Sequence, residues 1–190
     1  MSQRIALFGG SFDPFHLGHF LVAQKAWELF RPQRVVFLPC AHSPLKHSTP
    51  QATDAVRLRC LKKSLQGVPW AEVSDWEIRQ KGTSFSVHTA RRWRSLYPKL
   101  GLDWILGSDQ WAKIRQWRDY RELGRMVRFL VFPRPEPPKS IPGLRMRRVP
   151  LRIDLSASEI RHRLKTGQPI KGMVLPEAEK ILKQSGSYRS

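Results

Sequence analysis

The chain has 190 residues, a length that suits one domain with its own hydrophobic core. It carries 34 Lys and Arg residues against 15 Asp and Glu residues, so its net charge of +19 favours an anionic partner such as nucleic acid, a polyphosphate or a membrane surface. No run of about 18 apolar residues is present, which excludes a transmembrane helix, and no apolar signal segment opens the chain, so we expect a cytoplasmic protein.

A strand, a glycine turn and a helix are predicted at the start of the chain. Residues 5–8 form a short apolar run that ends in glycines, which is typical of a buried parallel strand entering a tight turn. Apolar residues then recur at helical spacing from Leu21 to Phe30, with His16 and His19 at the expected helix start. Two glycines let backbone N–H groups approach an anion, and a helix N-terminus adds unpaired donors and positive potential.

His16 and His19 stand three residues apart and therefore project from one face of the first helical turn. Two imidazoles so placed can hold phosphate oxygens and donate hydrogen bonds to charge that grows during a reaction. Zinc binding is the alternative for this spacing, but zinc needs three or four protein ligands, and no cysteine or third histidine lies nearby in sequence. The pattern favours a loop that grips phosphate, although two glycines alone also fit an ordinary turn.

Short apolar runs alternate with longer amphipathic segments along the rest of the chain, which predicts an α/β fold. Right-handed crossovers between such strands give a Rossmann-like doubly wound parallel sheet, here in a single domain of residues 1–190 with a small C-terminal helical part. The carboxyl ends of the strands would bring the loop at Gly9 and the loop at 107–109 together. Further strands are expected at 34–38, 71–78, 103–106 and 128–132, helices at 53–65 and 86–97 and from about 156, and a proline-rich surface connector at 133–142.

Residues 155–161, LSASEIR, form a second candidate phosphate motif. Ser156 falls where a helix should begin, and Glu159 lies three residues later, like the partner in a capping box. The N–H groups that a cap satisfies can bind phosphate instead, with the Ser158 hydroxyl and the Arg161 guanidinium as direct donors. A plain helix cap is the alternative, and the two roles are compatible.

The segment GGSFDPFHLGH at residues 9–19 resembles the signature of the nucleotidylyltransferase superfamily, in particular of the bacterial nicotinate mononucleotide adenylyltransferases. Residues 105–109, 155–161 and 175–189 resemble later motifs of that family in the same order. The resemblance implies transfer of the adenylyl group of ATP, with Mg²⁺ as cofactor, to nicotinate mononucleotide. It implies catalytic roles for His16 and His19, and ATP binding by Gly9, Gly10, Ser11, Phe12, Gly107, Asp109, Ser156, Ser158 and Arg161.

The acceptor side also follows from the resemblance. Residues 38–46 resemble a family loop that ends in lysine, with Leu45 where the pattern has histidine, and residues 83–86 resemble the family's PSYT. Residues 116–118 resemble a segment whose tryptophan stacks on the pyridine ring, with Arg118 in place of the usual aromatic neighbour. The resemblance implies acceptor binding by Lys46, Ser84, Phe85, Ser86 and Trp117.

Two other functions stay open. The first is another reaction of the same superfamily, with CTP as donor or with nicotinamide mononucleotide or phosphopantetheine as acceptor. The second is a basic nucleic-acid-binding protein, although the basic clusters at 57–63, 91–94 and 145–148 are typical of solvated faces and no nucleic-acid module signature is present. We therefore expect only weak, non-specific nucleic-acid binding, and the sequence allows a homo-oligomer. Cys40 and Cys60 are too few for a disulfide framework and are expected to be buried thiols.

Overall fold

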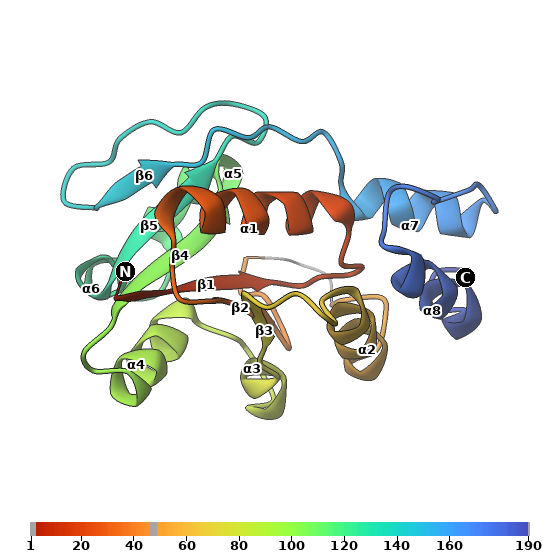
Figure 1. The fold of residues 1–190 in the computed structure, drawn as a ribbon, viewed down its shortest axis with the longest axis horizontal. Coiled ribbons are helices and arrows are strands. Elements are labelled where there is room, and N and C mark those ends of the chain that lie inside the picture. The colour runs from red at the N-terminus through yellow and green to blue at the C-terminus, as the bar shows by residue number, and fades with distance from the viewer. Residues whose placement is uncertain (1–2, 46–48, 190) are drawn as a thin grey trace.

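A six-stranded sheet forms the centre of the computed structural model, which describes residues 3–45 and 49–189 (Figure 1). The strand order is β3-β2-β1-β4-β5-β6, and every neighbouring pair is parallel. This confirms the Rossmann-like doubly wound sheet, whose order reverses between β1 and β4, the place where such sheets bind ligands. The strands are β1 (Arg4–Gly10), β2 (Val35–Pro39), β3 (Ala71–Val73), β4 (Gly101–Gly107), β5 (Val127–Phe132) and β6 (Met146–Arg148).

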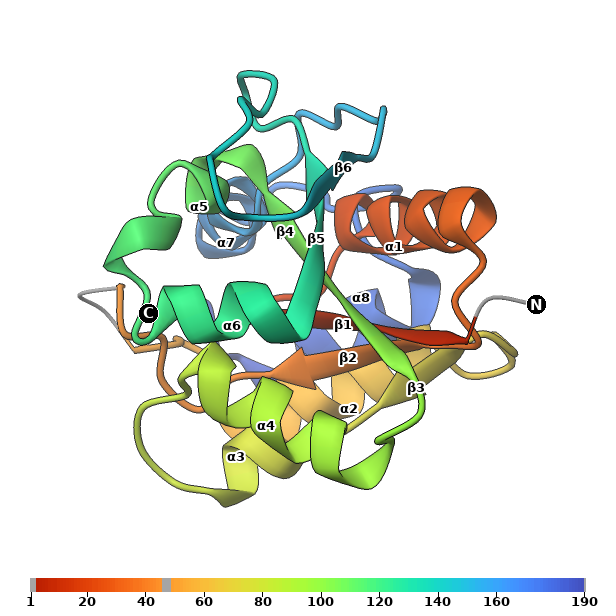
Figure 2. The same ribbon diagram turned by 90° about the vertical axis from the view of Figure 1, so that its left-hand side faces the viewer.

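Helices cover both faces of the sheet. Figure 1 shows α1 and α4 on opposite sides of β1, and Figure 2 shows α6 lying beside α4. No helix within residues 3–45 and 49–189 has the length and apolar character needed to cross a membrane. The helices are α1 (Leu17–Phe30), α2 (Asp54–Ser64), α3 (Trp76–Arg79), α4 (Ser86–Leu96), α5 (Ser108–Trp111), the 3₁₀ helix η1 (Ile114–Gln116), α6 (Tyr120–Met126), α7 (Ala157–Lys165) and α8 (Pro176–Ser185).

The central strands are buried on both faces because successive side chains point to opposite sides of the sheet. On one side, Leu7 belongs to the same core cluster as Trp93 of α4. On the other side, Phe8 belongs to a cluster with Val22 of α1 and Leu61 of α2. Each central strand therefore reads as a continuous apolar run, which is the pattern that predicted it.

A third apolar cluster forms the small C-terminal helical part. It joins Cys60 of α2 with Ile160 of α7, Ile181 of α8 and Tyr188. Figure 1 shows α8 next to α2, with α7 above α8, beyond the end of β1 from which α1 departs. Both cysteines are buried thiols, as predicted, and burial raises the pKa of Cys60 to about 12.

Some short elements differ from the prediction. The extended segment predicted at 71–78 is wrong beyond Val73, because the chain turns at Ser74, whose hydroxyl accepts from Trp76 N, and α3 follows. The Trp76 ring packs edge-on against Trp93 at 6.0 Å between centroids, so a tertiary contact holds this single turn of helix. Neither α5, α6 nor β6 was predicted, since none contains enough apolar residues to show a period.

Candidate active site

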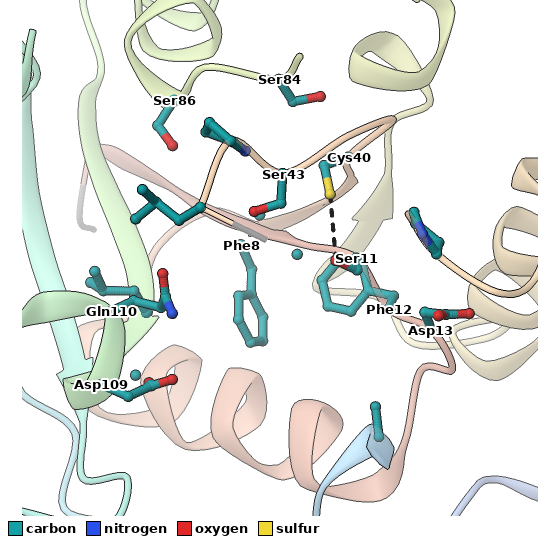
Figure 3. A pocket seen from close by; sticks show the side chains of 18 of the residues that line it. Phe8, Ser11, Phe12, Asp13, Cys40, Ser43, Ser84, Ser86, Asp109 and Gln110 are labelled. Atoms are coloured by element: carbon teal, nitrogen blue, oxygen red, sulfur yellow. Dashed lines mark hydrogen bonds between the residues drawn. The ribbon is translucent and has the colours of Figure 1, made fainter. Parts of the chain in front are cut away.

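A cleft of about 650 Å³ opens at the carboxyl ends of β1 and β4 (Figure 3). The loop at Gly9 and the loop at 107–109 both line it, which confirms that the two loops meet there. The starts of α4 and α7, the segment after η1 and the segment after β2, with residues 43–45 and 49–51, also line it. A cleft of this volume at a topological switch point is typical of a site for a small ligand.

His16 and His19 form a reciprocal pair at the start of α1. His16 is the N-cap, and its Nδ1 accepts from His19 N at 3.3 Å, while Nδ1 of His19 accepts from His16 N at 3.3 Å. The two rings stack with their centroids 3.6 Å apart. Because each Nδ1 is an acceptor, the neutral rings carry their hydrogen on Nε2. Both residues line the cleft, where a neutral imidazole can donate from Nε2.

His16 is held in its neutral form. Its side chain is 3 % exposed, and its buried Nε2 has no hydrogen-bond partner in the described chain. Burial, with a smaller effect from the positive charge of Arg134, lowers the pKa of His16 to about 3. At neutral pH the ring is therefore an uncharged donor whose Nε2–H lacks an acceptor, and a buried donor in this state favours binding of an anionic oxygen.

The loop between β1 and α1 is held close to aromatic rings. A Cβ added at Gly9 would lie 3.2 Å from the Trp104 ring, and one at Gly10 would lie 3.2 Å from the Phe12 ring. Phe12 adopts φ 45°, a left-handed conformation that is uncommon for a non-glycine residue. The glycines thus give room for rings as well as for an anion, and this packing fixes the loop backbone at the edge of the cleft.

Asp13 connects this loop to distant parts of the chain. Its carboxylate accepts from Gln51 N at 2.9 Å, from Ala52 N at 3.1 Å and from the Tyr188 hydroxyl at 2.6 Å. Its carbonyl oxygen accepts from Nη1 of Arg161 at 2.8 Å. Burial, together with the bond to Asp13, raises the pKa of Tyr188, so its hydroxyl stays a donor. Asp13 therefore fixes the loop against the C-terminal part.

Arg57 of α2 supports the same loop from beneath. Its side chain is fully buried, with Nη1 donating to the Ser11 carbonyl at 2.6 Å and Nη2 to the Cys40 carbonyl at 2.8 Å. The prediction that the cluster at 57–63 is a solvated face is wrong for Arg57, because this residue lies on the inner side of α2. Arg59, two positions along, is exposed as predicted.

The start of α7 contributes hydrogen-bond donors to the lining of the cleft. Ser156 is the N-cap, and its hydroxyl accepts from Glu159 N at 3.1 Å, which confirms the predicted cap. Ser158 and Arg161 line the cleft, with Nη2 of Arg161 donating to the Ser158 hydroxyl at 3.0 Å. The structure places Ser156, the remaining predicted ATP-binding residue of this motif, outside the lining, where its hydroxyl serves the helix.

Asp109 and Arg134 also line the cleft. Asp109 lines the cleft, and its buried Oδ1 has no hydrogen-bond partner in the described chain. Ser108, which precedes it, accepts from Arg134 N at 2.6 Å and so fixes the loop that carries the Arg134 charge close to His16. Residues 3–45 and 49–189 contain no group of three or more His, Cys, Asp and Glu that could hold a metal ion.

The predicted acceptor residues line another wall of the same cleft. Figure 3 shows Ser84 and Ser86 on one side and Asp109 on the other. Phe85 and Trp117 line the cleft too, and the Trp117 ring packs edge-on against Trp104 at 6.3 Å. Lys46, the predicted cation of the acceptor side, lies outside the described residues.

Four buried polar residues around the cleft were not predicted as site residues from the sequence: Asp13, Arg57, Glu77 and Tyr188. Glu77 accepts from the Thr89 hydroxyl at 2.6 Å, and burial raises its pKa. Asp13 stood inside the recognised motif, so its charge among apolar neighbours was a usable signal. Arg57 was hidden in a basic run, and Tyr188 lies too far along the chain for local reasoning to pair it with Asp13.

Comparison with known proteins agrees with this arrangement. The family model described as cytidylyltransferase-like matches residues 7–163. Two curated relatives are both named probable nicotinate-nucleotide adenylyltransferase. The one from Opitutus terrae is 37% identical and aligns over 98% of this chain and 98% of its own length. The one from Methylacidiphilum infernorum is 34% identical and aligns over 98% of this chain and 93% of its own length. The Plasmodium falciparum nicotinic acid mononucleotide adenylyltransferase, solved in complex with NaAD, shares the fold with a TM-score of 0.82, 19% identity and coverage of 97% of each chain. The chain belongs to the cytidylyltransferase-like family, among the nicotinate-nucleotide adenylyltransferases.

Proposed function

We propose that the protein transfers the adenylyl group of ATP to nicotinate mononucleotide, forming deamido-NAD and pyrophosphate. The observation that carries this proposal is the stacked pair of His16 and His19 in the lining of a cleft that unites two phosphate-type loops with an aromatic wall. The names of the relatives support the same donor and acceptor.

The reaction needs positioning of anions more than acid–base chemistry. The 5′-phosphate of the acceptor attacks the α-phosphorus in line, a new P–O bond forms, and the bond to the β-phosphate oxygen breaks as pyrophosphate leaves with its electron pair. No covalent enzyme intermediate forms. A phosphate monoester is already an anion at neutral pH, so no general base is required. The barrier falls because the two substrates are aligned and the growing charge meets fixed donors.

The residues of the cleft divide this task. His16 and His19 donate from Nε2 to oxygens around the α-phosphorus, and a neutral His16 does so without a change of protonation. Ser158 and Arg161 bind the β- and γ-phosphates, whose charge rises as pyrophosphate departs. The proposed nucleotide contacts are Gly9, Gly10, Ser11, Phe12, Gly107 and Asp109, and the proposed acceptor contacts are Lys46, Ser84, Phe85, Ser86 and Trp117.

Mg²⁺ fits this site as a companion of ATP. Mg²⁺ prefers one or two carboxylates together with phosphate oxygens and water. Asp109 supplies a buried carboxylate oxygen without a partner, whereas the carboxylate of Asp13 is already hydrogen-bonded. Asp109 would hold the cation, which would offset the charge of the triphosphate.

A direct assay tests the proposal. The purified protein is mixed with Mg²⁺, with ATP or CTP as donor, and with nicotinate mononucleotide, nicotinamide mononucleotide or phosphopantetheine as acceptor. The nucleotidyl-transfer product and pyrophosphate are measured together. We expect both products with nicotinate mononucleotide. Turnover only with CTP, or only with phosphopantetheine, would assign the chain to another reaction of the superfamily. Because the reaction consumes ATP and a metabolic intermediate, we also propose that the protein acts in the cytoplasm.

A further inference from the structure

Arg118 places a positive charge on the aromatic wall of the cleft. It follows Trp117 at the end of η1, and both residues line the cleft. The guanidinium carbon of Arg118 lies 4.8 Å from the centroid of the Phe85 ring. A guanidinium stacked on an aromatic face is held in a fixed plane while its N–H groups remain available at its edge.

The other arginines in the described lining of the cleft serve the opposite end. Arg161 donates to the Asp13 carbonyl and to the Ser158 hydroxyl, and Arg134 lies close enough to His16 to lower its pKa. Arg118 alone of these three stands beside Phe85 and Trp117. The wall proposed to receive the pyridine ring therefore has its own cation.

The neighbours of Arg118 leave this cation able to bind an anion. Its ion pair with Asp119 joins Nε to Oδ2 at 3.8 Å, near the limit for such a pair, and the two side chains are 55% and 49% exposed. Asp119 also lies 3.9 Å from Nη2 of Arg91, so its charge is shared. The Arg118 guanidinium donates no hydrogen bond to another residue of the described chain. A carboxylate entering the cleft would meet an oriented donor with little competition.

We propose that Arg118 binds the carboxylate on the pyridine ring of the acceptor and thereby selects the acid over its amide. This inference rests on the proposed function and names the residue that sets its acceptor specificity. The planar guanidinium can donate two parallel hydrogen bonds to a carboxylate. A carboxamide has no charge, offers one acceptor oxygen and turns N–H donors toward the donors of Arg118, so it gains less and meets a repulsive contact.

The test compares Arg118→Gln and Arg118→Lys with Arg115→Gln, a matched change of an exposed arginine on η1 that does not line the cleft. Values of kcat and KM are measured for nicotinate mononucleotide, for nicotinamide mononucleotide and for ATP. We expect Arg118→Gln to lower kcat/KM for the acid by about 10- to 100-fold, mainly through KM, because a charge-assisted contact is lost. The KM for ATP and the kcat/KM for the amide should stay within about twofold, with Arg118→Lys intermediate and Arg115→Gln unchanged.

The outcomes separate this inference from the proposed function. If the wild-type protein converts neither mononucleotide, the proposed function fails and the inference fails with it. If the wild-type protein prefers the acid and Arg118→Gln keeps that preference, only the inference fails. An equal loss for acid and amide would also overturn it, because that result would assign Arg118 a structural role.

Discussion

The His16 imidazole both caps the start of α1 and lines the candidate active site. Nδ1 caps α1, and Nε2 lies buried at the cleft without a partner. The two roles use different ring atoms, so substitution can separate them. Asparagine offers a cap oxygen near the position of Nδ1 but has nothing at the position of Nε2, whereas alanine removes both.

We expect His16→Asn to lower kcat by about 100-fold or more while leaving the free energy of unfolding within about 0.5 kcal/mol of wild type, since one donor to developing phosphate charge contributes that much to rate. His16→Ala should lose about 1 kcal/mol more through the missing cap. Adenylyl-transfer assays and urea denaturation measure the two effects.

His19→Ala should lower kcat by about as much as His16→Asn. His162→Ala, which removes an exposed histidine of α7, is the control. Near-normal turnover in folded His16→Asn would remove His16 from the mechanism.

The depressed pKa of His16 makes a second, thermodynamic prediction. The folded protein holds this pKa at about 3, whereas the ordinary value is 6.5. Between these values the unfolded chain binds a proton that the folded chain does not, so the free energy of unfolding falls as pH decreases below 6.5, by up to about 1.4 kcal/mol per pH unit. In His16→Asn this contribution is absent. The stability difference between wild type and variant should therefore be constant above pH 6.5 and shift in favour of the variant from pH 6.5 to 5. Urea titrations across that pH range measure this difference in the free energy of unfolding. A difference that does not change with pH would mean that His16 is solvated.

At the scale of elements, periodicity predicted those that bury an apolar face and missed those held by single contacts. The predicted helix at 53–65 is α2 with Thr53 as its N-cap, and the predicted start near Ser156 is the cap of α7. In contrast, β6 lies in a basic run with no apolar alternation and becomes a strand only because β5 offers it an edge. Short elements of this kind depend on partners that the local sequence does not specify.

The second helix supplies a support that the sequence concealed, namely Arg57 beneath the loop that carries Ser11. We expect Arg57→Met to lower the free energy of unfolding by about 2 to 4 kcal/mol, because the buried Cys40 carbonyl and the partly buried Ser11 carbonyl both lose their donor. The KM for ATP should rise as well, since the loop backbone loses its anchor. Arg59→Met changes an exposed arginine of the same helix and should stay within about 0.5 kcal/mol. Equal effects of the two substitutions in denaturation experiments would argue against a buried anchor.

The start of α7 contributes Arg161, and its removal should affect the two substrates unequally. We expect Arg161→Ala to raise the KM for ATP at least tenfold and that for the mononucleotide much less, because a charge-assisted contact to the leaving phosphates is lost. Some loss of kcat should accompany this, since Arg161 also holds the Asp13 carbonyl. Arg163→Ala, which breaks an ion pair with Glu159 on the same helix, is the matched control. If both KM values stay unchanged, α7 is only a capped helix beside the cleft.

For the whole molecule, the candidate site depends on contacts between the two ends of the chain. The Tyr188 hydroxyl reaches Asp13, and Arg161 reaches the same loop, so the C-terminal part closes onto the first loop of the sheet. The sequence predicted which loops meet, because parallel strands bring their carboxyl ends to one edge. Buried pairings such as that of Asp13 with Tyr188 could not be predicted, because they are set by the packing of α8 on α2 and leave no local pattern.

The net charge of +19 is also a property of the whole molecule, and the structure distributes it widely. Lys62 and Lys63 lie on α2, whereas Arg91 lies on α4 and pairs with Glu122 at 2.6 Å. Cations scattered over different elements, some of them already paired, attract nucleic acid through counterion release but do not read its sequence.

We therefore expect weak binding to duplex and single-stranded DNA that falls steeply as salt rises to about 150 mM and shows no preference for sequence or structure. ATP should compete little, because the cleft that contains Gly9 and Ser158 is separate in sequence from the basic clusters of α2 and α4. Fluorescence anisotropy with labelled oligonucleotides at several salt concentrations, with and without ATP, measures these quantities. Submicromolar binding that selects one structure at about 150 mM salt would contradict this expectation and indicate a dedicated nucleic-acid surface, since specific complexes persist under those conditions through contacts that scattered charges do not provide.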